Sequence, residues 1–455
     1  MTSNYPFTIR RSTITVGCAC ALLLAGCSGG SSDSGTPGTT VTTAEVVKTD
    51  AQIAFAAYSD AITTAQAMQT ALQALVDTPS EATLTAARDA WLAAREPYGQ
   101  TEIYRFRLSP IDSLDGVAEN GPEPRINAWP LGEAMIDYVA TNIDGDAGPE
   151  ATAPTVAPNI IADQVNMPTI DKDALIAFNQ QGGDERNVTT GYHAIEFLLW
   201  GQDLNAGTST FDGAAQRDST PGQRPYTDYL ATTEGCTSGA GNPAPEVICT
   251  RRGQYLLAAG QLLIDDLQSV ADQWNPTTGA YYASYTGNPD RSLASMVESM
   301  GRLGFGELAG ERINIALTQD SQEDEHSCFS DNTHRDIMLN AKGIQNSYLG
   351  TYQRVDGSTV SGPNLKSYLE ATSQAALATE LNDRIAATMA AAAVVDAEAK
   401  AGTPFDQQIQ QGGINDPEIK AIIAGLVSQT QSIEAVIAAL KLSTGDLRQD
   451  TEEQL

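Results

Sequence analysis

All three histidines of this 455-residue chain fall in two short stretches that also carry carboxylates. In the first stretch, GYHAIEFLLWG (191–201), Glu196 follows His193 by three positions, which places imidazole and carboxylate on one face of a helix. The other residues of the stretch are apolar enough for burial, and burying polar groups is costly unless they are paired. The spacing therefore predicts either a hydrogen-bonded pair in a core or two ligands of a metal ion.

The second stretch, DSQEDEHSCFSDNTHRD (320–336), carries His326 and His334 with Asp331 and further acids. Imidazole together with carboxylate oxygen suits iron, zinc or manganese better than copper(I), which prefers sulfur. The acids alone are weak evidence, because the chain has 57 of them. The polar residues just before His334 could also cap the following helix. We predict that His326, His334 and Asp331 contact a metal or a ligand.

The first stretch lacks the arrangement of a zinc peptidase. Such a helix uses HExxH, in which two histidines bind the metal and a glutamate acts as general base. Here Ala194 occupies the base position and Phe197 the position of the second histidine, and the inverted motif HxxEH fails at Phe197 too. The pair resembles, in reversed order, the ExxH element of helix-bundle iron sites. The pattern favours metal binding over hydrolysis.

One histidine and one glutamate under-ligate a metal, so remote carboxylates must contribute. Glu133 is the candidate that we select from the first half of the chain. Further acidic candidates lie in both halves: Glu102, Asp112, Asp137, Glu307 and Glu311.

Charge limits the class of partner. The formal net charge of −31 at pH 7 repels phosphate backbones, so we expect no nucleic acid as a partner. We expect a metal ion or a metal chelate instead, and the sequence indicates no particular protein partner.

The N-terminus reads as an export signal. Residues 1–26 hold two arginines, a short apolar segment and Leu-Ala-Gly before Cys27, which resembles the bacterial lipobox. In that class of signal Cys27 is lipidated, and residues 27–43 form a Gly/Ser/Thr-rich tether. We expect a lipid-anchored envelope protein, at the outer membrane and facing the periplasm, whose lipid is its only membrane attachment. The most apolar later segment, 387–401, is interrupted by charges and is predicted to be a packed helix.

The remaining cysteines agree with an oxidising compartment. Cys236 and Cys249 flank a Gly/Pro-rich loop and are the obvious disulfide pair. Closing so short a loop stabilises a fold by about 3 kcal/mol on the chain-entropy estimate. Cys328 lacks an obvious activating arrangement beyond the nearby His326, and we expect either a buried thiol or a labile thiol near the metal.

Helical periodicity dominates the rest of the chain, and alternating β patterns are scarce. We predict an all-α protein of two helical-bundle-like domains, residues 44–201 and 252–445, joined by a loop-rich belt at 202–251. An old duplication of one bundle is a further interpretation.

The motifs together resemble the imelysin family. GYHAIEFLLWG matches its GxHxxE motif through Gly191, His193 and Glu196, and AAREPYGQTEIYRF resembles its N-terminal half. MGRLGFGELAGERINIAL followed by DEHSCFSDNTHRD is similar to the branch called iron-regulated protein A. The resemblance implies two helical-bundle-like domains, attachment to the bacterial envelope and a role in iron uptake. Founding members were described as metallopeptidases.

The expected function is therefore an envelope lipoprotein that binds iron, with zinc or another divalent metal as the alternative ion. A metallopeptidase is the second hypothesis and a non-catalytic envelope adaptor is the third. Whether the two histidine stretches build one site or two is open at this stage.

Overall fold

Long helices make up most of the computed structural model, which describes residues 40–139, 159–204, 217–238, 244–413, 416–449, 451 and 455. The predicted all-α class is confirmed. Within these ranges the strands form one antiparallel hairpin of β1 (Thr351–Gln353) and β2 (Thr359–Ser361). The predicted signal peptide and the lipidation site Cys27 lie outside the described residues, as does the tether up to residue 39.

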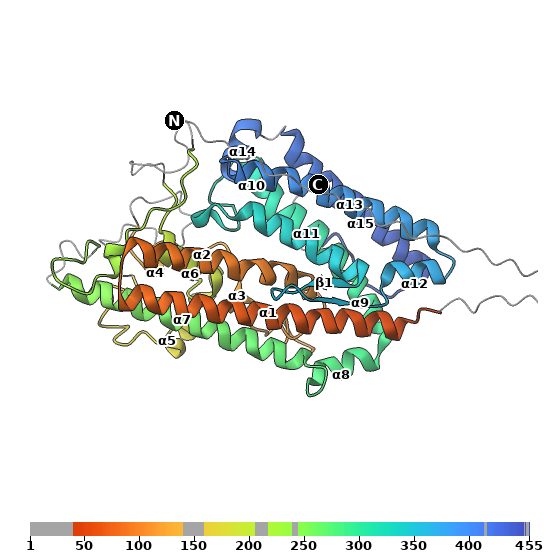
Figure 1. Cartoon of the computed structure of the whole chain (residues 1–455), viewed down its shortest axis with the longest axis horizontal. Coiled ribbons are helices and arrows are strands. Elements are labelled where there is room, and N and C mark those ends of the chain that lie inside the picture. Colours follow the sequence, from red (N-terminus) through yellow and green to blue (C-terminus); the bar gives the residue numbers. More distant parts are fainter. Residues whose placement is uncertain are drawn as a thin grey trace, which may run out of the picture. The chain divides into compact units, whose positions relative to one another are not determined.

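Three long helices form the first layer: α1 (Thr43–Asp77), α2 (Glu81–Tyr98) and α7 (Pro245–Trp274). Thr42 and Glu45 form a capping box at the start of α1, and Ser80 with Thr83 does the same for α2, which fixes where each helix begins. α1 packs against both α2 and α7, and the three run side by side in Figure 1. The 3₁₀ helix η1 (Gly99–Tyr104) continues α2.

Short elements connect α2 to α7: α3 (Glu123–Ile126), α4 (Glu133–Ile136), α5 (Lys172–Phe178), η3 (Gln181–Gly183), α6 (Gly191–Trp200) and η4 (Tyr226–Tyr229). α4 is a single turn that ends at Ile136, and Asp137 has extended backbone, so Glu133 and Asp137 do not share one helical face. The two carboxylates therefore have different partners. The disulfide between Cys236 and Cys249 is present, with a Cα–Cα distance of 6.0 Å.

The elements of the chain after α7 are α8 (Ala280–Gly287), α9 (Pro289–Arg302), the π-helix η5 (Leu303–Asn314), α10 (Ile315–Gln319), η6 (Cys328–Ser330), α11 (Thr333–Leu349), α12 (Leu365–Ala371), α13 (Ala375–Lys400), α14 (Phe405–Gly412) and α15 (Pro417–Leu440). α8 packs beside α1 and α7, whereas α11, α13 and α15 form a second layer (Figure 1). α11 packs on η1 and on α13, and α13 packs on α15 (Figure 1). Segment 387–401 is thus part of a packed helix, as predicted.

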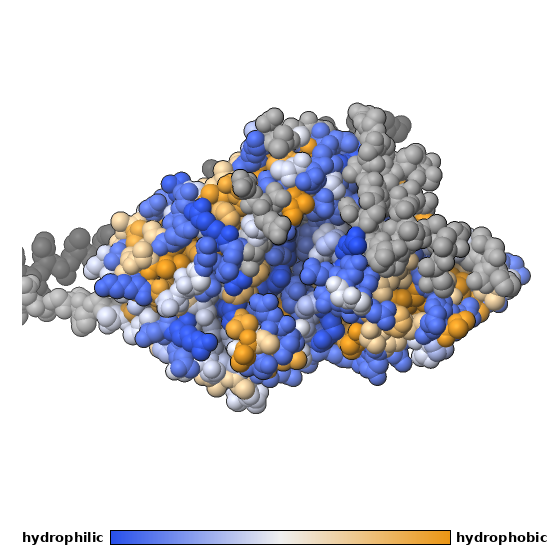
Figure 2. Space-filling model, turned by 180° about the vertical axis from the view of Figure 1, so that it is seen from behind, coloured by the Kyte–Doolittle hydropathy of each residue, from blue (hydrophilic) through white to orange (hydrophobic). Residues whose placement is uncertain are grey.

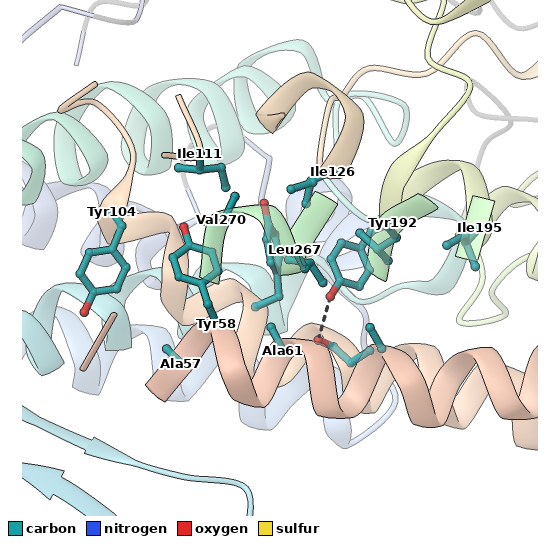
Figure 3. Close-up of a cluster of buried hydrophobic side chains, with 14 of the residues drawn as sticks. Ala57, Tyr58, Ala61, Tyr104, Ile111, Ile126, Tyr192, Ile195, Leu267 and Val270 are labelled. Carbon is teal, nitrogen blue, oxygen red and sulfur yellow. Dashed lines mark hydrogen bonds between the residues drawn. The ribbon is translucent and has the colours of Figure 1, made fainter. Parts of the chain in front are cut away.

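The larger hydrophobic core lies between α1, α6, α7 and the segments that follow α2. Figure 3 shows Tyr58 of α1 near Ile111, and Ile126 near Tyr192, whose hydroxyl donates to the carbonyl of Ala94. A smaller core joins η5, α13 and α15. Residues 41–455 form one compact unit, and the predicted division into two domains joined at 202–251 stays a prediction.

α15 is the one described helix that is long and apolar enough to cross a membrane by length and composition alone. Ile419, Ile422 and Leu426 are buried in the smaller core, so packing accounts for its apolar character. The face drawn in Figure 2 is mainly hydrophilic, with a hydrophilic hollow near its middle. Such a surface is expected of a chain with 57 acidic residues.

Candidate functional site

α6 is held against the loop after α2 by a close approach at Gly191. Gly191 has φ +81°, and a Cβ there would lie 2.4 Å from the carbonyl oxygen of Ile126. Only glycine adopts this conformation without strain and leaves room for that backbone. The approach places residues 126–130 beside α6, whose ten residues are all buried.

His193 and Glu196 form the predicted pair inside this buried helix. Nδ1 of His193 lies 2.9 Å from Oε2 of Glu196, and both side chains are fully buried. Oε1 of Glu196 accepts hydrogen bonds from the backbone N–H and the hydroxyl of Ser330, at 3.0 and 2.6 Å. Both oxygens of Glu196 are therefore engaged, and the carboxylate ties α6 to the second histidine stretch.

His326 has its own carboxylate partner. Nδ1 of His326 lies 2.8 Å from Oδ2 of Asp336, and Oδ1 of Asp336 accepts from Arg95 at 2.8 Å. Arg95 also donates to Oδ1 of Asn127, so the amide nitrogen of Asn127 is the atom that faces Nε2 of His326, at 3.4 Å. Because an amide N–H is a donor, this contact favours the tautomer with the proton on Nδ1 and a lone pair on Nε2.

The imidazole rings of His193 and His326 are in contact. The ring centroids of His193 and His326 are 4.6 Å apart, with the planes at 78°. Within the described part of the chain, Nε2 of His193 is buried and has no hydrogen-bond partner. The same holds for Nε1 of the adjacent Trp129, whose ring centroid is 5.1 Å from that of His193. The two histidine stretches thus come together at His193 and His326.

Burial keeps both histidines neutral. It lowers the pKa of His193 well below its ordinary value, and the nearby His326 adds to the effect. Burial, reinforced by Arg312, lowers the pKa of His326 to about 4. Burial opposes ionisation of Asp336, but Arg95 outweighs it and holds the pKa of that carboxyl well below its usual range. Burial raises the pKa of Glu196. Neutral imidazole is the form that binds metals.

A pocket of about 330 Å³ leads to this site, with Asn127, Trp129 and His326 among its lining residues. Five acidic side chains also line it, against two arginines: Glu123, Glu185, Glu307, Glu311 and Asp324, with Arg105 and Arg312.

The acids nearest the arginines form an ion network. Glu102 pairs with Arg312 at 2.8 Å and with Arg105 at 3.1 Å. Burial opposes its ionisation, but the two arginines lower the pKa of Glu102 to about 2. Burial raises the pKa of Glu123 to about 7. Glu307, the other predicted remote candidate here, pairs with the same arginines, at 3.1 Å from Arg105 and 2.7 Å from Arg312.

Three predicted ligands have other partners. Nδ1 of His334 contacts the backbone carbonyl of Asp331 at 2.9 Å, and its Nε2 lies 3.8 Å from Asp396. Burial and the charge of a neighbouring acid raise the pKa of Asp331. Glu133 accepts from Gln202, and burial raises its pKa to about 8. Metal contact by His334, Asp331 or Glu133 stays a prediction.

Two further candidates are engaged in structural contacts. Asp137 pairs with Arg224 at 2.7 Å and with Arg252 at 2.6 Å. Asp112 accepts backbone hydrogen bonds from Arg107 and Ser109.

The donor set fits a metal through two nitrogen atoms. Among the described residues, Nε2 of His193 is a buried atom without a hydrogen-bond partner. The lone pair on Nε2 of His326 faces the amide N–H of Asn127 at 3.4 Å, and a metal would have to replace that contact. Across the described ranges, no group of three or more His, Cys, Asp or Glu side chains is arranged to hold a metal ion. The remaining coordination positions would fall to water or to groups that arrive with the metal.

Sequence reasoning missed the residues that orient the pair. Arg95, Asn127 and Trp129 carry no local signature, because each reaches the site only through the packing of α2 and the loop after it. Ser330 was one of the polar residues that could cap the following helix, but α11 begins without a side-chain cap bond and Ser330 binds Glu196. Cys328 is buried as predicted.

Comparison with known proteins agrees with this architecture. The iron-regulated protein A of Synechococcus elongatus is 24% identical over 352 residues, 77% of this chain and 74% of that protein. A crystal structure of an iron-regulated protein A precursor from Parabacteroides distasonis shares the fold with a TM-score of 0.56 at 16% identity, covering 89% of this chain and 97% of that one. An imelysin-like protein from Psychrobacter arcticum gives 0.55 at 15%, covering 90% and 100%.

The model of the imelysin family (peptidase M75) matches residues 54–438, which include both histidine stretches. The match spans most of the chain, and the protein therefore belongs to the imelysin family.

Proposed function

We propose that this protein binds iron through Nε2 of His193 and Nε2 of His326, as an envelope protein of iron uptake or homeostasis. The observation that carries the proposal is the contact between two neutral imidazoles, one of which has a buried Nε2 that no described residue engages. An unpaired buried polar atom costs stability, so a ligand that engages it offsets that cost.

The carboxylates behind the imidazoles support the same conclusion. Metal-binding histidines commonly donate their second ring N–H to a carboxylate, which fixes the ring and makes the free nitrogen more basic. Glu196 stands behind His193 and Asp336 behind His326, at 2.9 and 2.8 Å. In this proposal Glu196 and Asp336 position the ligands and do not bind the ion.

The pocket supports a cation as the cargo. Its five acidic side chains exceed its two arginines, so the mouth attracts positive charge. With two protein nitrogens, the ion keeps positions for water or for a chelator, and about 330 Å³ leaves room for a small chelator. Imidazole nitrogens bind zinc with higher affinity than iron(II), so zinc or another divalent metal ion would compete with iron for this site.

The envelope setting rests on the leader and on relatives. Residues 1–26 and Cys27 have the pattern of a lipoprotein signal, and we propose a lipid anchor at Cys27 that holds the protein at the outer membrane, facing the periplasm. The relatives named iron-regulated protein A support iron as the metal.

The geometry argues against a peptidase. A general base must reach the water that it activates, but Oε1 of Glu196 is occupied by Ser330 and its Oε2 by His193. Chelator-sensitive peptide cleavage that Glu196→Gln abolishes would restore the peptidase hypothesis. An adaptor without metal is the remaining alternative, and it requires that His193→Ala lower the melting temperature without changing metal content.

The test is metal analysis of the full chain in detergent, with anaerobic titration of iron(II) and a competing titration of zinc. We expect one iron per chain in the wild type and at least a tenfold loss of affinity in His193→Ala and in His326→Ala. His334→Ala is the matched control, since His334 lies outside the pair, and it should keep the metal. A wild type without stoichiometric metal, or equal affinity in all three variants, would overturn the proposal.

A further inference from the structure

A second cavity, of about 490 Å³, lies away from the histidines, between residues 107–116 and parts of α7, α8 and α9. We propose that it binds an acidic saccharide, with Tyr281 as the platform for a sugar ring and Arg291 as the partner of a carboxylate. The proposal is independent of metal binding, because none of the lining residues belongs to the imidazole site.

The aromatic platform is rigid. Tyr281 and Tyr285 stack at 5.7 Å and 22°, and Trp274 contacts both rings at 4.7 and 5.3 Å. The hydroxyl of Tyr285 donates to Asp50 at 2.7 Å, which anchors the inner ring. Tyr281 is partly exposed and lines the cavity, so the exposed part of its ring is available to the apolar face of a sugar.

Uncharged polar groups surround the platform. Five serines line the cavity with two amides: Ser113, Ser269, Ser284, Ser292, Ser295, Gln273 and Asn288. In the described part of the chain, the side chains of Gln273, Ser284 and Ser295 make no hydrogen bond within the protein. Such groups donate to and accept from the hydroxyls of a saccharide.

The charge of this cavity is opposite to that of the chain. Arg291 is exposed, lines the cavity and forms no ion pair with any described residue. The other lining arginine, Arg107, is paired with Asp50 at 3.1 Å. The single lining acid, Asp115, accepts hydrogen bonds from within its own turn, including the backbone of Val117 and Ala118. One guanidinium is thus left for an anion in a protein of net charge −31.

The aromatic ring, the uncharged polar groups and the guanidinium of Arg291 together indicate one class of ligand. A small inorganic anion would use Arg291 but would leave most of the 490 Å³ and the aromatic ring without a contact. A neutral sugar would use the ring and the hydroxyls but not the guanidinium. A saccharide that bears a carboxylate uses all three.

The test is isothermal titration of the full chain in detergent with tetragalacturonic acid, compared with its carboxyl-reduced neutral counterpart and with acetate. We expect saturable binding of the acidic tetrasaccharide and about tenfold weaker binding of the neutral one. Arg291→Ala and Tyr281→Leu should each weaken the acidic ligand about tenfold. Arg384→Ala, which removes another exposed arginine, should leave binding unchanged.

Absence of saturable binding by the wild type would overturn the proposal, as would equal binding by Arg291→Ala. Binding of acetate as tight as that of the tetrasaccharide would show a general anion site and would also overturn it. Because Arg291 is exposed, its variant should fold, and an unchanged melting temperature checks this. His193→Ala should bind the tetrasaccharide normally, so failure of the metal proposal and failure of this one are distinguishable.

Discussion

Ser330 donates two hydrogen bonds to one oxygen of Glu196, from its backbone N–H and from its hydroxyl, although 134 positions separate the two residues. The other oxygen of Glu196 faces His193. One buried carboxylate therefore orients an imidazole and holds together the two sequence stretches that carry all the histidines. The variants below test that relationship and its surroundings.

Glu196→Gln should weaken iron binding by 10- to 100-fold, the usual effect of losing a carboxylate behind a metal-binding histidine. The amide can still accept from Ser330, but its NH₂ group faces Nδ1 of His193 and forces the ring proton onto Nε2. That atom then has no lone pair for a metal. Iron titration measures the change, with Glu96→Gln, at a carboxylate paired to Arg335, as the control. Equal affinity in both variants would contradict the positioning role.

Ser330→Ala should lower the free energy of unfolding by about 0.5–1.5 kcal/mol, the range for a typical hydrogen bond, because burial raises the pKa of Glu196 and disfavours its charged form. The backbone donor remains, so the loss is limited to the hydroxyl contact. Urea unfolding measures it. Ser358→Ala, which removes an exposed hydroxyl bonded to Asp356, should change stability by less than about 0.5 kcal/mol. A loss no larger than that of the control would show that the contact contributes nothing.

Gly191→Ala should destabilise the fold more than Gly182→Ala. Both glycines have positive φ, +81° and +78°, so both variants bear the same backbone strain of about 1 kcal/mol. Only at Gly191 does the new Cβ meet a backbone atom, the Ile126 carbonyl oxygen, whereas Gly182 has nothing within 4 Å. We expect an additional loss of about 2 kcal/mol in denaturant unfolding. Equal losses would mean that the loop at Ile126 moves freely.

Glu133 should make the protein less stable as the pH rises. Burial raises its pKa in the fold to about 8 from an ordinary value of 4.5. The folded state then holds a proton that the unfolded state releases, so stability is full below pH 4.5 and falls as the pH rises towards 8. Glu133→Gln should remove this part of the pH dependence in urea unfolding from pH 5 to 9. Glu234→Gln, at an exposed position, should leave it unchanged.

The sequence determined the local part of this protein. Helical periodicity predicted the long helices, because that signal acts within one or two turns. The capping box of Ser80 and Thr83, which starts α2, is an equally local feature. The HxxE spacing predicted the contact between His193 and Glu196 for the same reason. The disulfide followed from two cysteines around one short loop.

Only the tertiary structure decided which histidine completes the site. The sequence does not distinguish His326 from His334 as the partner of His193. In the fold, the ring of His326 contacts that of His193, whereas His334 lies beside Asp396. The packing of α2 and its following loop brings Asn127, which accepts from Arg95, into contact with His326. No local sequence pattern encodes that contact. Spacing along a helix fixes neighbours within a turn, whereas neighbours from distant segments depend on how whole helices bury their apolar faces.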